Sequence, residues 1–230
     1  MLLRVLNLGK IIKMNFVYCV DTHKYVKVDQ CLKCLKCAPE EVFLFFMKSR
    51  SSKNVSVSDI LHPCLFHAYM SRHFRVASIY GLYKMFYGTV IHAGLAQYTN
   101  DSVKTNVRVE CNYKGVKIVG VIDKVNFERN EIWEFKTGIG SKVQEQLSLY
   151  KWMAEETKLL QNPELVAAFV RDDTIMIMKV KPVDVTKLLA RVPLIREVID
   201  KELVKNVPKK SKLCDRCEFK DGCNYLREAL

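Results

Sequence analysis

The sequence has no long hydrophobic run. Its longest apolar stretch, Val42 to Met47, is far shorter than the roughly 20 residues that a membrane-spanning helix requires. The N-terminal residues also lack an unbroken apolar segment followed by a small-residue cleavage site, so no secretory signal is predicted. Met14 is a second candidate start, which would leave residues 1–13 outside the protein. We therefore expect no association with a membrane.

Acidic residues are fewer than basic residues. The 230 residues include 37 Lys and Arg against 25 Asp and Glu, which gives a formal net charge of +12. This balance favours a polyanionic partner such as nucleic acid, and a lysine-rich surface of the thermophilic kind is the alternative. Hydrophobic residues make up 49% of the chain and no internal repeat is visible. The composition is that of a globular protein with one large domain, with or without a small appendage.

Cysteine is abundant by contrast, with nine residues. A secreted domain would pair them as disulfides, whereas here several are separated by two residues, a spacing typical of metal-thiolate sites. We therefore predict a reducing, cytoplasmic environment. Cys64 stands alone, far ahead of a C-terminal trio spaced C-x2-C-x5-C, namely Cys214, Cys217 and Cys223. A further set lies near the N-terminus, and Cys111 is left over.

Residues 1–48 are predicted to form an N-terminal extension with a small cysteine-rich unit. Within it, residues 24–28 alternate in a way that predicts a short hairpin. A structural zinc ion needs four ligands, and the candidates are Cys19, Cys31, Cys34 and Cys37, with His23 as a substitute for one of them. Bound metal would supply the folding energy that so small a core lacks. The alternatives are a second iron–sulfur cluster, or free thiols on a helix.

The polar segment 48–55 is the best linker candidate, and residues 56–230 form the second predicted domain. A first helix is expected to run through Cys64 to about residue 73. Further helices are expected at residues 79–98, 142–160 and 185–204, and strands at 105–113, 117–127, 132–137, 165–170 and 175–180. This order of elements predicts an α/β fold with a mixed central sheet flanked by helices.

Two carboxylates and a lysine are expected to meet on this sheet. Glu134 and Lys136 are two residues apart on one strand, so they share a face. If the preceding hairpin loop has an even number of residues, Asp123 emerges on the same face; an odd number would put it on the opposite face. Such a set suits Mg²⁺ or Mn²⁺ and the activation of water against a phosphodiester. The alternative is a surface Glu–Lys ion pair beside an unrelated aspartate.

Four short motifs follow one another along the chain, namely Gly88-x3-His92, Gly120-Val-Ile-Asp123, Glu134-Phe-Lys136-Thr-Gly138 and Gln146-x3-Tyr150. Their order resembles that of the RecB-type nucleases of the PD-(D/E)XK superfamily. Together with the cysteines, the series is similar to the CRISPR-associated RecB-like exonucleases and to the iron–sulfur nuclease domains of AddB and related repair enzymes. The resemblance covers roughly residues 56–225. Two departures are Ile122, where the superfamily has proline, and the N-terminal cysteine unit, which points to a stand-alone or viral relative.

The resemblance implies a restriction-endonuclease-like core and a role for each matching residue. The ligands of Mg²⁺ or Mn²⁺ would be His92, Asp123, Glu134 and the backbone carbonyl of Phe135. The catalytic lysine would be Lys136, beside the two carboxylates. The residues that shape the site and contact DNA would be Gln146 and Tyr150. The ligands of a 4Fe–4S cluster would be Cys64, Cys214, Cys217 and Cys223.

We therefore predict a metal-dependent DNA nuclease that acts on single-stranded DNA or DNA ends. Its role would lie in CRISPR spacer processing, in DNA repair and recombination, or in viral replication. Candidate partners besides DNA are CRISPR integrase proteins and further copies of the chain. The alternatives are a non-catalytic iron–sulfur or zinc subunit that binds DNA, and a zinc-dependent regulator.

Overall fold

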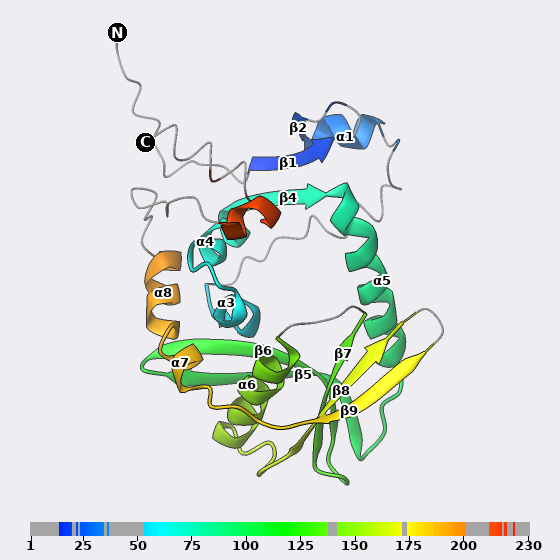
Figure 1. Ribbon diagram of the computed structural model, residues 1–230, viewed down its shortest axis with the longest axis vertical. Helices are drawn as coiled ribbons and strands as arrows, with labels where there is room; N and C mark the ends of the chain where they lie inside the picture. Colours follow the sequence, from blue (N-terminus) through cyan, green and yellow to red (C-terminus); the bar gives the residue numbers. More distant parts are fainter. Residues whose placement is uncertain are drawn as a thin grey trace. The chain divides into compact units, whose positions relative to one another are not determined.

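The computed structural model describes residues 14–19, 22, 24–34, 36, 53–137, 142–171, 174–200, 212–217, 219 and 223. The chain divides into two compact units. The large-sheet unit comprises residues 53–65 and 84–200 and contains a six-stranded sheet; the small-sheet unit comprises residues 1–52, 66–83 and 201–230 and contains a three-stranded sheet (Figure 1). Residues 66–83 thus group with β1 and β2 rather than with the large sheet.

The six-stranded sheet is mixed, as the order of elements predicted. Its strands are β3 (Val55–Ser56), β5 (Val103–Tyr113), β6 (Val116–Asn126), β7 (Glu131–Lys136), β8 (Glu164–Val170) and β9 (Ile175–Val180). They follow the order β3-β6-β7-β8-β9, and β5 pairs with β6 as well. The β3–β6 and β7–β8 pairs are parallel, and the other three are antiparallel.

Two hairpin turns join β5, β6 and β7. Lys114 and Gly115 connect β5 to β6 with φ values of 49° and 78°. Two successive positive φ angles define the turn that best matches the twist of paired strands, and glycine adopts this backbone at little cost. The loop between β6 and β7 holds residues 127–130, because Asn126 pairs with Glu131. It therefore has the even length on which the convergence of the site depends.

Helix α6 (Val143–Glu156) contacts β5, β7 and β8 (Figure 1). Residues fully buried in this layer include Ile118, Ile122 and Val125 of β6, Ile132 of β7, and Leu147 and Met153 of α6. Gly120 allows side chains of α6 and α3 to approach β6 closely. A Cβ atom there would lie 2.9 Å from Tyr150 Cε1 and 3.1 Å from Val57 Cγ2. At the sheet edge, β9 is exposed along most of its length, in contrast to β8, which is buried on both faces.

Two of the expected helices are broken in the structure, each time next to a proline. Helix α3 (Val57–Leu61) begins with a capping box, in which Ser56 N donates to Asp59 Oδ2 at 2.8 Å. It stops before Pro63, and the chain resumes as α4 (Phe66–His73). The expected 185–204 helix is likewise divided into α7 (Thr186–Leu189) and α8 (Val192–Asp200) ahead of Pro193. Proline has no N–H for the helical bond to the carbonyl four residues earlier.

The small-sheet unit shows that the N-terminal residues are not a free-standing hairpin. The expected hairpin is present, since β1 (Met14–Cys19) pairs antiparallel with β2 (Lys24–Lys27). However, β1 also pairs in parallel with β4 (Phe74–Ser78), a strand that the local pattern did not predict. Helix α1 (Val28–Cys34) follows β2. Near the C-terminus lies a short 3₁₀ helix, η3 (Lys212–Arg216).

Helix α5 (Ile79–Leu95) follows β4 in the chain and carries His92 in its last turn. Its length and start agree with the expected helix at 79–98. Despite its apolar character, neither it nor any other helix in the described ranges is long and apolar enough to span a bilayer.

Candidate active site

The site lies where β7 separates from β6. Strand β5 pairs with β6 from Val103 opposite Asn126 to Tyr113 opposite Val116, with one position omitted, so β3 and β7 must share the opposite edge of β6. On that edge β3 pairs with residues 118–119 and β7 with residues 124–126. The residues between, 120–123, face a gap between the two neighbouring strands. Asp123 stands at the end of this gap.

The β6–β7 register brings the two carboxylates together. The last paired residues of β6 and β7 on this side are Lys124 and Trp133, so continuation of the same register places Asp123 opposite Glu134. At this point a side chain replaces the backbone as hydrogen-bond acceptor, because Phe135 N donates to Asp123 Oδ2 at 2.8 Å. The convergence expected from an even loop is therefore present in the structure.

His92 reaches this carboxylate from α5. Its Nδ1 lies 3.2 Å from Asp123 Oδ1, and the side chains are 33% and 12% exposed. One turn earlier, Gly88 lets α5 pack closely against the end of β7, since a Cβ atom there would be 3.3 Å from Thr137 Oγ1. Glycine at this position therefore helps to bring the imidazole within reach of Asp123.

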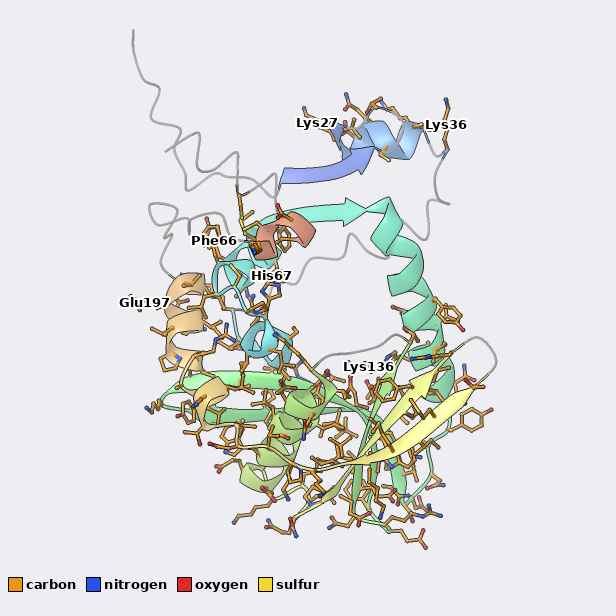
Figure 2. The ribbon with its side chains drawn as sticks, in the orientation of Figure 1. Lys27, Lys36, Phe66, His67, Lys136 and Glu197 are labelled. Atoms are coloured by element: carbon orange, nitrogen blue, oxygen red, sulfur yellow. The ribbon has the colours of Figure 1, made fainter. Side chains whose placement is uncertain are left out.

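Glu134, Lys136 and two residues of α6 form a hydrogen-bonded network. Lys136 Nζ donates to Glu134 Oε1 at 2.6 Å and to Gln146 Oε1 at 2.8 Å. Gln146 Nε2 in turn donates to Glu134 Oε1 at 2.8 Å and to the Tyr150 hydroxyl at 3.2 Å. Gln146 and Tyr150 are one helical turn apart, so they share a face of α6. Figure 2 shows the Lys136 side chain at the end of β7. We refer to these four residues, with His92 and Asp123, as the site cluster.

Burial shapes the electrostatics of the site cluster. Desolvation, followed by repulsion from Asp123, raises the pKa of Glu134 to about 7, although Lys136 acts in the opposite direction. The hydrogen bond to Asp123 raises the pKa of His92, against the effect of its partial burial. Burial raises the pKa of Tyr150 well above its ordinary value, so this phenol stays neutral. Glu134, His92 and Tyr150 therefore retain their protons more strongly than the same groups would in water.

One buried oxygen of the site cluster lacks a hydrogen-bond partner. Glu134 is 3% exposed, and its Oε2 is buried without a hydrogen-bond partner, a costly state for a carboxylate oxygen. Within the described parts of the chain, no three His, Cys, Asp or Glu side chains are placed so that they could hold a metal ion as they stand. The donor set nevertheless fits a hard divalent cation, because the carboxylates of Asp123 and Glu134 and the imidazole of His92 suit such an ion. A cation bound through Oε2 would also satisfy the orphaned oxygen.

The cysteines predicted to bind a cluster are placed in both units. In the large-sheet unit, Cys64 follows α3, and its backbone N–H donates to His62 Nδ1 at 3.2 Å. In the small-sheet unit, Cys217 N donates to Cys214 O at 3.2 Å, and Cys223 N to Phe219 O at 2.9 Å. The first bond closes a turn between Cys214 and Cys217, and the second joins Cys223 to Phe219. A shared iron–sulfur cluster stays a prediction.

The N-terminal cysteine set is only partly described. Cys31 and Cys34 lie one turn apart on α1, and the first is half-buried and the second exposed. Cys19 ends β1, and Cys37 lies outside the described residues, as do His23 and Gly138. Zinc binding by this set also stays a prediction.

Sequence reasoning missed a second arrangement of cations, which we call the α3 clamp. Arg191 Nη1 donates to Ile60 O at 2.7 Å, and its Nη2 donates to His62 O at 2.5 Å. Lys142 Nζ donates to the carbonyl of Leu61 between them. The two cations thus satisfy carbonyls that α3 leaves open at its C-terminal end. Their distance from α3 in the sequence gives no local signal of this role.

Comparison with known proteins agrees with this geometry. A family model described as the PD-(D/E)XK nuclease superfamily matches residues 99–224, more than half of the chain. The fold resembles that in the crystal structure of SSO0001, with a TM-score of 0.53 and 19% sequence identity over 85% of this chain and 95% of that one. No curated protein sequence matches the chain. On the match to the family model, the chain belongs to the PD-(D/E)XK nuclease superfamily.

Proposed function

We propose that this protein is a metal-dependent DNA nuclease whose active site is the site cluster. Members of the superfamily are phosphodiester hydrolases. The observation that carries the assignment is the meeting of Asp123, Glu134 and Lys136 at the β6–β7 separation, with Glu134 Oε2 buried and unsatisfied. A surface ion pair, the alternative considered from the sequence, would leave neither a buried carboxylate nor an orphaned oxygen.

The residues divide the chemistry among them. His92, Asp123 and Glu134 would hold Mg²⁺ or Mn²⁺, with the Phe135 carbonyl as a further ligand. When bound, the cation supplies charge stabilisation at the phosphate and lowers the pKa of water. Lys136, held between Glu134 and Gln146, can orient the attacking water or offset negative charge that develops on the phosphate. Water adds to phosphorus and the bond to the leaving oxygen breaks.

DNA, as a single strand or a duplex end, is the proposed substrate. Support comes from the family and from the net charge of +12, which favours a polyanion. Spacer processing with a CRISPR integrase, repair and recombination, and viral replication are the roles in which such an activity would serve. Self-association of the chain is compatible with each.

A 4Fe–4S cluster bound by Cys64 and the C-terminal trio is part of the proposal. Its support is the C-x2-C-x5-C spacing and the local hydrogen bonds that hold the trio in turns. The cluster would have a structural role, joining segments that are distant in sequence. For the N-terminal cysteines we propose zinc, because a half-buried and an exposed thiol on a seven-residue helix offer little core of their own.

The test is cleavage of end-labelled single-stranded and double-stranded DNA by anaerobically purified protein, with EDTA, Mg²⁺ or Mn²⁺. We expect cleavage only with added metal, and none by Asp123→Ala or Lys136→Ala. Both variants should keep the visible absorbance of an iron–sulfur cluster, and Cys217→Ala should lose both the colour and the iron. Lys179→Ala is the matched control, since this exposed lysine pairs with Glu164 on the sheet.

Full activity in either active-site variant would refute the assignment of the site. DNA binding without cleavage under all metal conditions would favour the non-catalytic subunit. Zinc instead of iron in elemental analysis would exclude the cluster but leave the nuclease assignment in place.

A further inference from the structure

One strand residue in the large sheet has an unusual backbone. Among the described residues, five that are not glycine have a positive φ. Four of them lie outside helices and strands, namely Lys114, Asn130, Lys158 and Asn162. The fifth, Asn106, has a φ of 50° and lies inside the eleven-residue strand β5. A left-handed residue inside a strand interrupts the extended backbone, and asparagine is among the few side chains that tolerate it.

The interruption is opposite the site. The β5–β6 register runs from Val103 opposite Asn126 to Tyr113 opposite Val116, and it omits a single position. That position is Asn106, and its partner in the same register would be Asp123. On its other edge β6 pairs with β7 only from Lys124 onwards. Asp123 is therefore outside the backbone ladder on both sides.

This placement has a consequence for the Asp123 carboxylate. A residue paired in a ladder has its backbone direction set by its neighbours, and its side chain stands perpendicular to the sheet. Asp123 instead turns its Oδ2 to Phe135 N on the adjoining strand and its Oδ1 to His92. Release from pairing with β5 gives Asp123 the freedom to adopt that direction. Asn106 itself is exposed, so packing does not explain its conformation.

We propose that Asn106 is a positioning residue for Asp123. Its left-handed backbone opens the β5–β6 ladder at one position, and this opening lets Asp123 bind Phe135 N and present its other oxygen to His92 and a cation. The effect of Asn106 on catalysis rests on the proposed function of the site cluster. The alternative is that Asn106 serves only the curvature of the sheet.

The experiment compares two substitutions at Asn106 with the same two at Asn130, which has a φ of 52° in the β6–β7 loop. Glycine accepts a positive φ, whereas valine disfavours it strongly. The measurements are the Mn²⁺ dissociation constant by titration, kcat and KM for DNA cleavage, the urea midpoint, and hydrogen exchange of the Phe135 amide.

Asn106→Gly should bind Mn²⁺ within about twofold of the unsubstituted protein and keep the Phe135 amide protected. Asn106→Val should let β5 pair regularly with β6. We expect its Mn²⁺ affinity to fall by about tenfold, its kcat to fall more than its KM rises, and Phe135 exchange to accelerate, with the urea midpoint unchanged or higher. Asn130→Val should show the reverse pattern, a lower urea midpoint with unchanged Mn²⁺ affinity.

Two results would overturn the proposal. One is an Asn106→Val protein with unchanged Mn²⁺ affinity and a protected Phe135 amide. The other is an equal loss in Asn106→Gly, since that would implicate the asparagine side chain rather than the backbone. If Asn106→Val does not fold, Asn106→Ala provides the same comparison. Because hydrogen exchange at Phe135 needs neither metal nor DNA, it tests the positioning role even if the unsubstituted protein proves inactive.

Discussion

Two groups of charged side chains in the large-sheet unit are satisfied in opposite ways. In the α3 clamp, Arg191 and Lys142 donate to the backbone carbonyls of three successive residues, Ile60, Leu61 and His62. In the site cluster, Glu134 accepts from Lys136 and Gln146 at one oxygen and from nothing at the other. The clamp cations find their acceptors within the chain. The site cluster keeps one carboxylate oxygen open for a ligand from outside the chain.

The difference separates stability from function. A charge whose hydrogen bonds are met stabilises the fold, whereas a buried carboxylate with an open oxygen and a raised pKa costs stability. Such a cost is expected where a protein must bind a ligand or stabilise a transition state. Substitution in the clamp should therefore reduce stability, and substitution in the site cluster should reduce activity.

The largest expected effect is that of Glu134→Gln. The amide is nearly the same size but carries no charge, so the cation loses a ligand and cleavage should fall by about 10³-fold. At neutral pH and without metal, the urea midpoint should rise, because a buried carboxylate that is costly to ionise has been removed. Cleavage of labelled DNA and urea unfolding measure the two effects. A less active and also less stable protein would mean that Glu134 is structural.

The second effect comes from the clamp. Arg191→Met keeps the aliphatic length but leaves the Ile60 and His62 carbonyls without their donor, and we expect a loss of about 2 kcal/mol in the free energy of unfolding. Arg191→Lys, which retains one cationic donor, should lose less. Mn²⁺ affinity should stay within about twofold in both variants. A selective loss of Mn²⁺ affinity would remove the distinction between the two groups.

A third substitution should reduce both stability and activity. Gly120→Ala places a Cβ 2.9 Å from Tyr150 Cε1, so the Tyr150 ring, or α6 with it, must shift, and Gln146 lies on the same helix. We expect a loss of about 1–3 kcal/mol in stability, together with reduced cleavage. Gly94→Ala is the control, because its Cβ would meet nothing within 4 Å and alanine favours a helix. Equal stability of the two variants would show that α6 tolerates displacement.

Much of the large sheet could be predicted because its signals are local. The strands alternate or are continuously apolar, and the polar loop of residues 127–130 has the even length that puts Asp123 beside Glu134. Helix α5 begins at the expected residue. The order of the motifs then singled out Gln146 and Tyr150. Their i, i+4 spacing alone would not have done so, because such pairs occur by chance in most long helices.

What escaped prediction depends on contacts between distant segments. Nothing in residues 74–78 indicates that β4 pairs with β1, and Arg191 has no sequence feature that links it to α3. The left-handed backbone of Asn106 is also invisible, since asparagine in an alternating strand is ordinarily just a polar outward residue. The breaks before Pro63 and Pro193 were accessible in principle, because proline cannot donate the helical hydrogen bond.

The last prediction is a dependence on pH that has opposite signs for folding and for metal binding. The pKa of Glu134 is raised from an ordinary 4.5 to about 7, and that of His92 is raised as well, so the folded protein binds more protons than the unfolded chain. Without metal, stability should therefore decline through Glu134 as pH rises from about 4.5 to about 7, and through His92 as pH rises above 6.5. Over the same interval Mn²⁺ affinity should increase, because the cation requires the ionised carboxylate and the neutral imidazole. Urea unfolding and Mn²⁺ titration at several pH values test both trends. In Glu134→Gln the decline should be shallower, and an unchanged slope would assign the proton uptake to groups outside the site cluster.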